Sequence, residues 1–450
     1  MKHVILFAFL AWSAQLGAQT GHVLQGSGPV NFSMGGAATA MPLDVTGALQ
    51  WNPATITAFR KTEIAASAAY FTATPSVYSR ANLPDGQGGF FPVEGLTKDE
   101  RGASVLPTLA VVFGRENSKF AWGISALGVS GFGVDYPMTT NLPGNPDFDP
   151  TSSNPLLYPQ NFMGFGHLYS DYQLLQVGLT GAYQIAEGLS IGLSPTFNYA
   201  SLQIEPVPIA APDQQRGYPI GEKASTTGFG GQVGVYYAMD NGFQLGVSYK
   251  TTQFFGDFEI DGKYLDGSEA PVTTFNMDYP SILSVGLGYS NDLLDVAVDY
   301  RYIDYANTDG FAKTGWVIAE NGFPNGAVAG FGWESIHVIA AGIQYKGIEK
   351  LPIRVGYTFN TNPITEDNVF LSSSAPAVIA NAAQLGLSYQ INEHWGLHAT
   401  YHHGFKTEVS GQLLNPMMIA ADNPLGKVPG TTMTSDMTTD VGLLGVSYQF

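Results

Sequence analysis

The chain contains no cysteine and few charged residues, and both deficits exclude whole classes of protein. Without cysteine, the 450 residues cannot form a disulfide, a catalytic thiolate, an iron–sulfur cluster or a Cys-bearing zinc site. Charged residues make up only 12%, about half of the roughly 25% usual in soluble domains. The 19 Lys and Arg residues are outnumbered by 37 Asp and Glu, so no continuous basic surface is available to bind nucleic acid.

Apolar residues are abundant but never form a long run. Hydrophobic residues make up 44% and aromatic residues 12%, which excludes a disordered chain. The longest early run, Val4 to Trp12, has nine residues, whereas a membrane-spanning helix needs about 20. Lys2 precedes this run and small residues follow it up to Ala18. We therefore predict that residues 1–18 are a secretory signal peptide.

Alternation of apolar with small or polar residues is the strongest pattern in the sequence. Leu283, Val285 and Leu287 share one face of a stretch whose other face carries Ser284 and Gly286. A period of two with aliphatic and aromatic residues predicts a β-strand. The pattern predicts fourteen strands, at residues 64–70, 109–113, 122–126, 175–183, 191–199, 233–237, 243–249, 281–289, 294–302, 341–345, 353–359, 385–391, 395–401 and 444–450.

The two faces of these strands favour a membrane barrel over a soluble sandwich. One face is almost wholly aliphatic or aromatic, whereas the other carries Asp, Arg, Gln, Asn and small residues. Lipid imposes this arrangement on a closed barrel, which is apolar outside and polar inside. We therefore predict an all-β fold, a fourteen-stranded antiparallel transmembrane barrel over residues 61–450.

The connections between the predicted strands alternate between long and short. Short turns occur at positions such as 186–188 and 392–394, and long loops at positions such as 79–104, 136–170 and 408–437. Outer-membrane barrels have short periplasmic turns and long extracellular loops, so both termini are predicted to be periplasmic. The last strand ends in Phe450, which resembles the signal that the barrel assembly machinery recognises.

Residues 19–60 do not alternate and are too apolar for a flexible tail, so we interpret them as a hatch packed inside the barrel. Gly35 and Gly36 lie among small residues, and Asn52-Pro53-Ala54 follows before the first strand. This stretch resembles the amino-terminal hatch of the FadL/TodX-type transporters of hydrophobic compounds. The resemblance spans nearly the whole mature chain and agrees with the predicted strand count, since that family folds as fourteen strands around a hatch.

A second stretch, Ser130 to Tyr136, is similar to the third strand of that family, where a kink opens the barrel wall. The resemblance implies a lateral gate at Gly131, Phe132 and Gly133. Two glycines around one aromatic residue also suit a bulge at which strand pairing stops. Relief of crowding in an ordinary strand would explain the same glycines.

The family resemblance implies passive uptake of hydrophobic small molecules, long-chain fatty acids or aromatic hydrocarbons, across the outer membrane of a Gram-negative bacterium. We expect a monomer in contact with outer-membrane lipid and lipopolysaccharide, with no cofactor, metal or catalysis. Two alternatives stay open, a general porin for hydrophilic solutes and a structural or adhesin barrel. The few charges and the apolar hatch disfavour the porin.

The predicted loop at 136–170 carries more apolar surface than a solvated loop usually exposes. Either a substrate groove or packing against neighbouring loops would account for it. The groove candidates are Leu156, Leu157, Tyr158, Phe162, Met163 and Phe165.

Several titratable residues fall on the predicted inner face of the barrel. His398 and His402 could bind a metal, but no third ligand stands at a useful spacing, so we predict polar packing in the lumen. Asp295, Asp299 and Arg301 share an inner face, and we predict an interior charge network there instead of a catalytic group.

Overall fold

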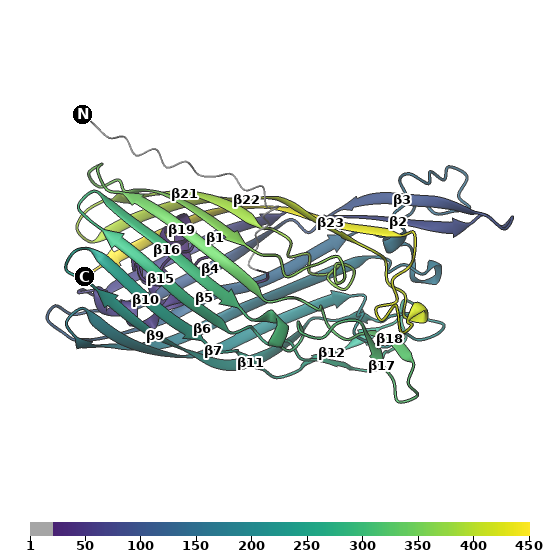
Figure 1. The fold of residues 1–450 in the computed structure, drawn as a ribbon, viewed down its shortest axis with the longest axis horizontal. Coiled ribbons are helices and arrows are strands. Elements are labelled where there is room, and N and C mark those ends of the chain that lie inside the picture. The colour runs from purple at the N-terminus through teal and green to yellow at the C-terminus, as the bar shows by residue number, and fades with distance from the viewer. Residues whose placement is uncertain (1–20) are drawn as a thin grey trace.

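The computed structural model describes residues 21–450, whose strands form a closed antiparallel barrel (Figure 1). The barrel wall contains the predicted fourteen strands, and pairing of the last with the first closes it. The predicted signal peptide lies outside the described residues. The wall strands are β1 (Glu63–Ala73), β4 (Ala103–Phe113), β5 (Phe120–Tyr136), β6 (Leu168–Ala186), β7 (Leu189–Glu205), β9 (Ala224–Ala238), β10 (Phe243–Lys250), β15 (Ile282–Ser290), β16 (Leu294–Ile303), β19 (Ile336–Tyr345), β20 (Ile353–Asn360), β21 (Asn381–Gln390), β22 (Trp395–Gly411) and β23 (Thr432–Gln449).

The two ends of the barrel differ as the alternating connections predict. One end, here called the turn end, carries short turns and the carboxyl terminus, and the other, the loop end, carries the long loops (Figure 1). The loops contain short elements of their own. These are β2 (Ser76–Pro84), β3 (Phe90–Lys98), β8 (Ile220–Gly221), β11 (Phe254–Phe255), β12 (Phe258–Ile260), β13 (Gly262–Lys263), β14 (Thr273–Phe275), β17 (Trp316–Ile318), β18 (Pro324–Val328), η2 (Pro155–Leu157), η3 (Gln160–Phe162), η4 (Tyr305–Asn307) and η5 (Pro416–Met418).

Many strands extend further toward the loop end than predicted. The strand predicted at 122–126 is β5, which continues to Tyr136. Residues 79–104, predicted as a loop, largely form the β2–β3 hairpin. Strand β2 also pairs with the loop-end part of β23, residues 432–436. Above the lipid, the outer face no longer needs apolar side chains, so the alternation fades although backbone pairing continues.

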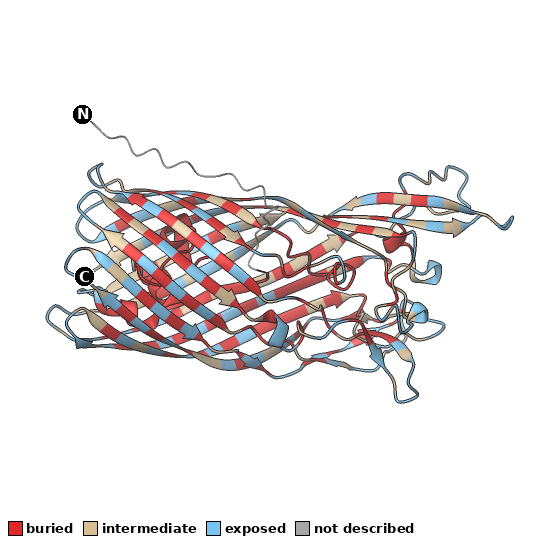
Figure 2. Cartoon of the chain, viewed as in Figure 1, coloured by how far each residue is buried: buried red, intermediate tan, exposed pale blue. Residues whose placement is uncertain are grey.

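The orientation of the side chains follows the predicted faces. Val285 is 44% exposed on the outer surface, whereas the neighbouring Ser284 is only 1% exposed. Buried and exposed residues alternate in the same way along the wall strands (Figure 2). Closure of the sheet pairs the backbone groups of every wall strand, and the apolar outer face suits contact with lipid.

The described part of the hatch lies inside the barrel and is almost entirely buried. It contains two short α-helices, α1 (Gly28–Ser33) and α2 (Val45–Trp51), and the 3₁₀-helix η1 (Pro53–Ala58). The side chain of Asp44 caps the start of α2 by accepting a hydrogen bond from the amide of Gly47. No helix within residues 21–450 is both long and apolar enough to cross a membrane.

Glycines on the inner face of the wall allow the hatch backbone to approach the strands closely. A Cβ atom added at any of six such glycines would lie 1.9–2.5 Å from a hatch atom, which is far inside van der Waals contact. These six wall glycines are Gly192, Gly234, Gly246, Gly342, Gly356 and Gly386. The hatch and the wall therefore fit together without space for any larger side chain at these positions.

Candidate functional site

Asn52-Pro53-Ala54 anchors the hatch to the barrel wall. The Asn52 side chain donates hydrogen bonds to the carbonyl oxygens of Thr39 (2.8 Å) and Val235 (3.0 Å) and accepts one from the amide of Ala54. Its Oδ1 atom would lie 1.9 Å from a Cβ at Gly234, on the inner face of β9. This motif thus joins two parts of the hatch to one wall strand.

Gly35 and Gly36 lie where the hatch turns against the wall. Their φ angles are 69° and 81°, in the left-handed region that favours glycine. A Cβ on Gly35 would lie 2.7 Å from the carbonyl oxygen of Ala341, and one on Gly36 would lie 1.9 Å from that of Gln25. Any other residue at these positions would therefore displace the hatch.

Asp299 and Arg301 form a buried ion pair that holds the hatch from the side of β16. The two groups are 2.8 Å apart, and each side chain is only 1% exposed. Asp299 also accepts hydrogen bonds from the backbone amides of Ala38 (2.8 Å) and Thr39 (2.9 Å). The guanidinium group of Arg301 lies 3.5 Å above the ring of Trp51. This is an interior charge network, as the sequence predicts.

The other polar candidates on the inner face have separate partners. Asp295 pairs with Lys346 at 2.8 Å, away from the Asp299–Arg301 pair. His398 lies within hydrogen-bond distance of Ser388 and Ser447, and His402 contacts Gln384. Among residues 21–450, no three His, Asp or Glu side chains are grouped as metal ligands.

One seam of the barrel wall is unpaired toward the loop end. Strands β4 and β5 are paired near the turn end, from Phe113 with Trp122 as far as Thr108 with Leu127, and not beyond. Above this point β4 pairs with β1 alone and β5 with β6 alone, and the register of β5 shifts between Gly128 and Ser130. We call the unpaired stretch, between 103–107 of β4 and 128–134 of β5, the wall gap.

The first residues of the hatch bind the free edge of β5 in the wall gap. The amide of Leu24 donates to the carbonyl oxygen of Val129 at 3.0 Å, and the amide of Gly131 donates to that of His22 at 3.2 Å. Ser130 adds a side-chain hydrogen bond to the carbonyl oxygen of His22. We call His22–Leu24 the sealing segment, because it occupies backbone groups that an unpaired strand would leave free.

A cavity of about 50 Å³ lies in the wall gap, and the gate candidates line it. Its apolar lining comes from Leu24, Phe71, Leu106, Gly131, Phe132 and Gly133. The kink itself lies earlier in β5 than these glycines, at the register shift, and both glycines remain paired with β6. Gly131 therefore leaves space in the gap, whereas the Arg101 side chain packs against Gly133. The loss of pairing begins three residues before Gly131.

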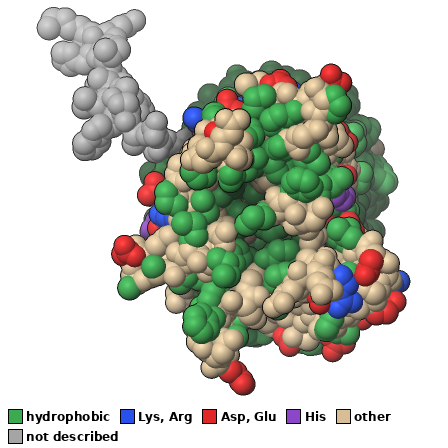
Figure 3. Space-filling model, turned by 90° about the vertical axis from the view of Figure 1, so that its right-hand side faces the viewer, with side chains coloured by type: hydrophobic (Ala, Val, Ile, Leu, Met, Phe, Trp, Pro, Cys, Tyr) green, Lys and Arg blue, Asp and Glu red, His purple; other side chains and the backbone are tan. Residues whose placement is uncertain are grey.

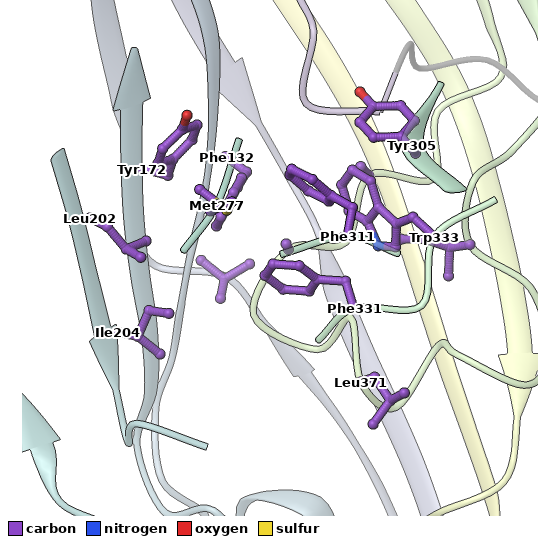
Figure 4. Close-up of a cluster of buried hydrophobic side chains, with 14 of the residues drawn as sticks. Phe132, Tyr172, Leu202, Ile204, Met277, Tyr305, Phe311, Phe331, Trp333 and Leu371 are labelled. Carbon is purple, nitrogen blue, oxygen red and sulfur yellow. The ribbon is translucent and has the colours of Figure 1, made fainter. Parts of the chain in front are cut away.

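An aromatic cluster lies next to the wall gap, because its Phe132 and Tyr172 also line the cavity there. Figure 4 labels Phe132, Tyr172, Tyr305, Phe311 and Trp333 of this cluster. At its centre is the imidazole of His22, whose centroid lies 4.6–6.5 Å from those of six aromatic rings. The aromatic cluster consists of His22 with Phe132, Tyr172, Tyr279, Tyr305, Phe311 and Trp333. Sequence reasoning missed His22, because its partners come from four distant segments and no local motif marks it.

His22 is a neutral, buried residue of the hatch. Its Nδ1 atom and its backbone amide both contact the hydroxyl of Tyr305, at 2.9 and 3.1 Å. Burial lowers the pKa of His22 to about 3, so the imidazole carries no charge at physiological pH. The centre of the cluster is therefore a buried, mainly aromatic environment with a neutral imidazole, which suits apolar ligands.

The groove candidates of the β5–β6 loop are not brought together. Leu156, Leu157 and Tyr158 are buried against neighbouring loops, whereas Phe162 and Met163 are 48% and 85% exposed. The ring centroids of Phe165 and Phe370 lie 5.5 Å apart, and Phe165 packs against the large buried hydrophobic cluster of which Phe370 is part. Seen from the loop end, hydrophobic side chains line a hollow at the centre of this face, with acidic side chains around its edge (Figure 3).

Comparison with solved structures finds the same fold in several channels. The crystal structure of the P. putida toluene transporter TodX is 16% identical, covers 95% of this chain and 99% of that one, and gives a TM-score of 0.64. A Pseudomonas aeruginosa FadL homologue is 14% identical over 96% and 99% of the two chains, with a TM-score of 0.65. The Ralstonia pickettii toluene transporter TbuX is 15% identical over 95% and 99%, with a TM-score of 0.61.

Comparison with curated protein sequences gives no match. The family model described as outer membrane protein transport protein (OMPP1/FadL/TodX) matches residues 7–147 and 158–450, which is nearly all of the sequence. The chain therefore belongs to the OMPP1/FadL/TodX family of outer-membrane transport proteins.

Proposed function

We propose that the protein carries hydrophobic small molecules passively across the outer membrane and releases them sideways through the wall gap. The observation that supports this most directly is the apolar cavity in the gap, which adjoins the aromatic cluster. Phe132 and Tyr172 belong to both, so the lumen and the gap are continuous in apolar surface. Toluene transport by the related TodX and TbuX agrees with an aromatic substrate.

The physical basis is a dry route past the polar leaflet of the membrane. An apolar molecule gains free energy when it leaves water for the hollow at the loop end and then for the aromatic cluster. From the cluster, the wall gap leads directly toward lipid, so no aqueous channel through the hatch is required. No energy source is required for movement down a concentration gradient.

The hatch argues against the porin alternative. Its two helices and η1 fill the lumen with buried side chains, and glycines bring the wall into direct contact with its backbone. We infer that hydrophilic solutes do not pass. We also infer that the protein is not an enzyme, because the matching family consists of transport proteins. Measurable permeation of small sugars through the purified wild-type protein in vesicles would contradict the sealed lumen.

We further propose that the termini are periplasmic and that the long loops face outward. The barrel would then contact lipid around its wall and lipopolysaccharide near the loop end, as a monomer. The barrel assembly machinery would recognise Phe450, which follows the strand that closes the barrel. The motivating observation is that the carboxyl terminus lies at the turn end (Figure 1).

Trypsin added to intact cells tests this orientation. Arg216 and Lys263 are exposed on the loops, and Arg115 and Lys119 are exposed in the turn between β4 and β5. Only the loop sites should be cut in intact cells, and the turn sites should be cut as well after the outer membrane is permeabilised. Cleavage at Arg115 in sealed cells would reverse the proposed topology.

The Gly131→Leu variant tests lateral release. A Cβ at Gly131 meets only the carbonyl oxygen of Tyr172, at 3.1 Å, so the larger side chain extends into the cavity. We expect toluene uptake by cells to fall about tenfold or more, equivalent to adding ~1.4 kcal/mol to the barrier.

The matched control is Gly442→Leu on β23, where an added Cβ meets nothing within 4 Å. Uptake by the control should stay at the wild-type rate, and both variants should show normal heat-modifiable folding. Unchanged uptake by a correctly folded Gly131→Leu variant would exclude release through the wall gap.

A further inference from the structure

The wall gap is closed at both of its ends, so it is a window in the barrel wall and not an open seam. Toward the turn end, the pairing of Thr108 with Leu127 closes it. Toward the loop end, the amide of Glu100 donates to the carbonyl oxygen of Asp135 at 2.9 Å. The amide of Asp135 in turn donates to Oδ1 of Asp99 at 2.6 Å. The segment just before β4 is thereby bound to the end of β5.

One ion pair spans the loop-end part of this window. The guanidinium group of Arg101, just before β4, pairs with the carboxylate of Asp171 on β6. The Arg101 side chain crosses β5 at Gly133, where an added Cβ would lie 2.6 Å from its Cζ atom. Gly133 is itself paired with Asp171 between β5 and β6. The ion pair therefore joins one edge of the wall gap to the strand beyond the other edge, and we call it the clasp.

The clasp lies on the outer side of the wall and has little contact with water. Asp171 shares a face of β6 with the exposed Leu175, because side chains alternate along a strand. The side chains of Arg101 and Asp171 are nevertheless only 18% and 12% exposed. An ion pair with so little solvent contact is weakly screened, so it restrains its two ends more strongly than a fully exposed pair does.

Arg101 also lines the cavity of the wall gap, and among the described residues that do so it alone is charged. Phe71, Leu106 and Phe132 line the same cavity, so a substrate in the gap would lie beside both the apolar lining and the clasp. Parting the clasp next to an apolar molecule would leave two charges without partners, which costs free energy. The clasp therefore opposes widening of the gap toward the loop end.

We propose that the clasp between Arg101 and Asp171 sets the largest substrate that the wall gap releases. While the clasp holds, the loop-end edge stays in place, and the gap widens only where the sealing segment lies. A larger, fused-ring molecule displaces more of the wall, so its passage requires the clasp to part. Arg101 is thus a positioning residue that determines size specificity. This inference rests on the proposed function, which is release through the wall gap.

Uptake of toluene and naphthalene by cells, each measured above the uptake of cells that lack the protein, tests the proposal. Neither probe has a hydrogen-bonding group, and they differ in ring number. In Arg101→Met, which removes the charge, we expect the ratio of naphthalene to toluene uptake to rise about fivefold, close to the effect of one half-buried ion pair. Asp171→Asn should raise the ratio similarly. The double variant should raise it no further, because either change alone removes the pair.

Lys223→Met is the matched control. The Nζ atom of Lys223 lies 3.2 Å from the other carboxylate oxygen of Asp171, but Lys223 does not line the cavity. This variant should keep the wild-type ratio, and all variants should show normal heat-modifiable folding. An unchanged ratio in Arg101→Met, or an equal rise in Lys223→Met, would overturn the role of the clasp. The proposed function would survive that result if Gly131→Leu still blocks toluene uptake, and it fails separately if Gly131→Leu does not.

Discussion

In the Asp299→Ala variant, the free energy that favours the docked hatch over the undocked one is expected to fall by about 3–5 kcal/mol, because a buried guanidinium group is left without its partner. It also removes the acceptor for the amides of Ala38 and Thr39. Hydrogen exchange of peptides covering residues 34–41 should become much faster. Vesicles containing the variant should also begin to swell in small sugars, because a loosened hatch admits hydrophilic solutes.

Two further variants separate this effect from a general loss of stability. Asp292→Ala removes an exposed carboxylate from the turn between β15 and β16, and it should change neither measurement. Arg301→Met in the Asp299→Ala background removes the unpaired charge and should restore part of the lost protection. Wild-type exchange rates in Asp299→Ala would show that the ion pair does not hold the hatch.

A disulfide between the sealing segment and β5 is expected to abolish most uptake. The cavity of the wall gap, about 50 Å³, is smaller than a cavity of roughly 150 Å³ that is known to hold benzene, so we expect the gap to widen as a substrate passes. The sealing segment is the element bound to its edge. Val23 and Ser130 face each other as an antiparallel pair between the two hydrogen bonds, where Cα atoms are about 4.5 Å apart, within disulfide range.

Because the native chain has no cysteine, the variant Val23→Cys/Ser130→Cys can form only this disulfide within one molecule. Oxidised cells should take up toluene about tenfold more slowly or worse, and a reductant should restore uptake. Each single cysteine variant should be insensitive to oxidant. Equal uptake by the oxidised and reduced double variant would show that the sealing segment stays in place during transport.

The barrel could be predicted from the sequence because each strand in contact with lipid must alternate apolar side chains on its outer face with small or polar ones on its inner face. Strands such as 281–289 and 294–302 follow this rule over their whole length and were found with the correct faces. The β2–β3 hairpin lies beyond the lipid and is held by pairing with β23, so its residues carry no comparable pattern. The long connection predicted there is confirmed, but the hairpin within it could not be predicted for this reason.

The candidate site could be predicted only in part, because its contacts join segments that are remote in sequence. The glycines of the wall gap were found through a local motif and a family resemblance. The contact between His22 and Tyr305 spans 283 positions and leaves no local signal. Leu156 and Met163 look equally apolar in sequence, yet one is buried and the other is 85% exposed.

The six wall glycines limit how the barrel can open. If the whole hatch moved out of the lumen, the strand backbone would be exposed to water at six positions that now lie against hatch atoms. Wall and hatch would each lose a matched surface that neither can rebuild alone. The hatch is therefore better described as part of the barrel core than as a removable stopper. We therefore expect motion during transport to involve the few residues ahead of α1, while the rest of the hatch stays in place.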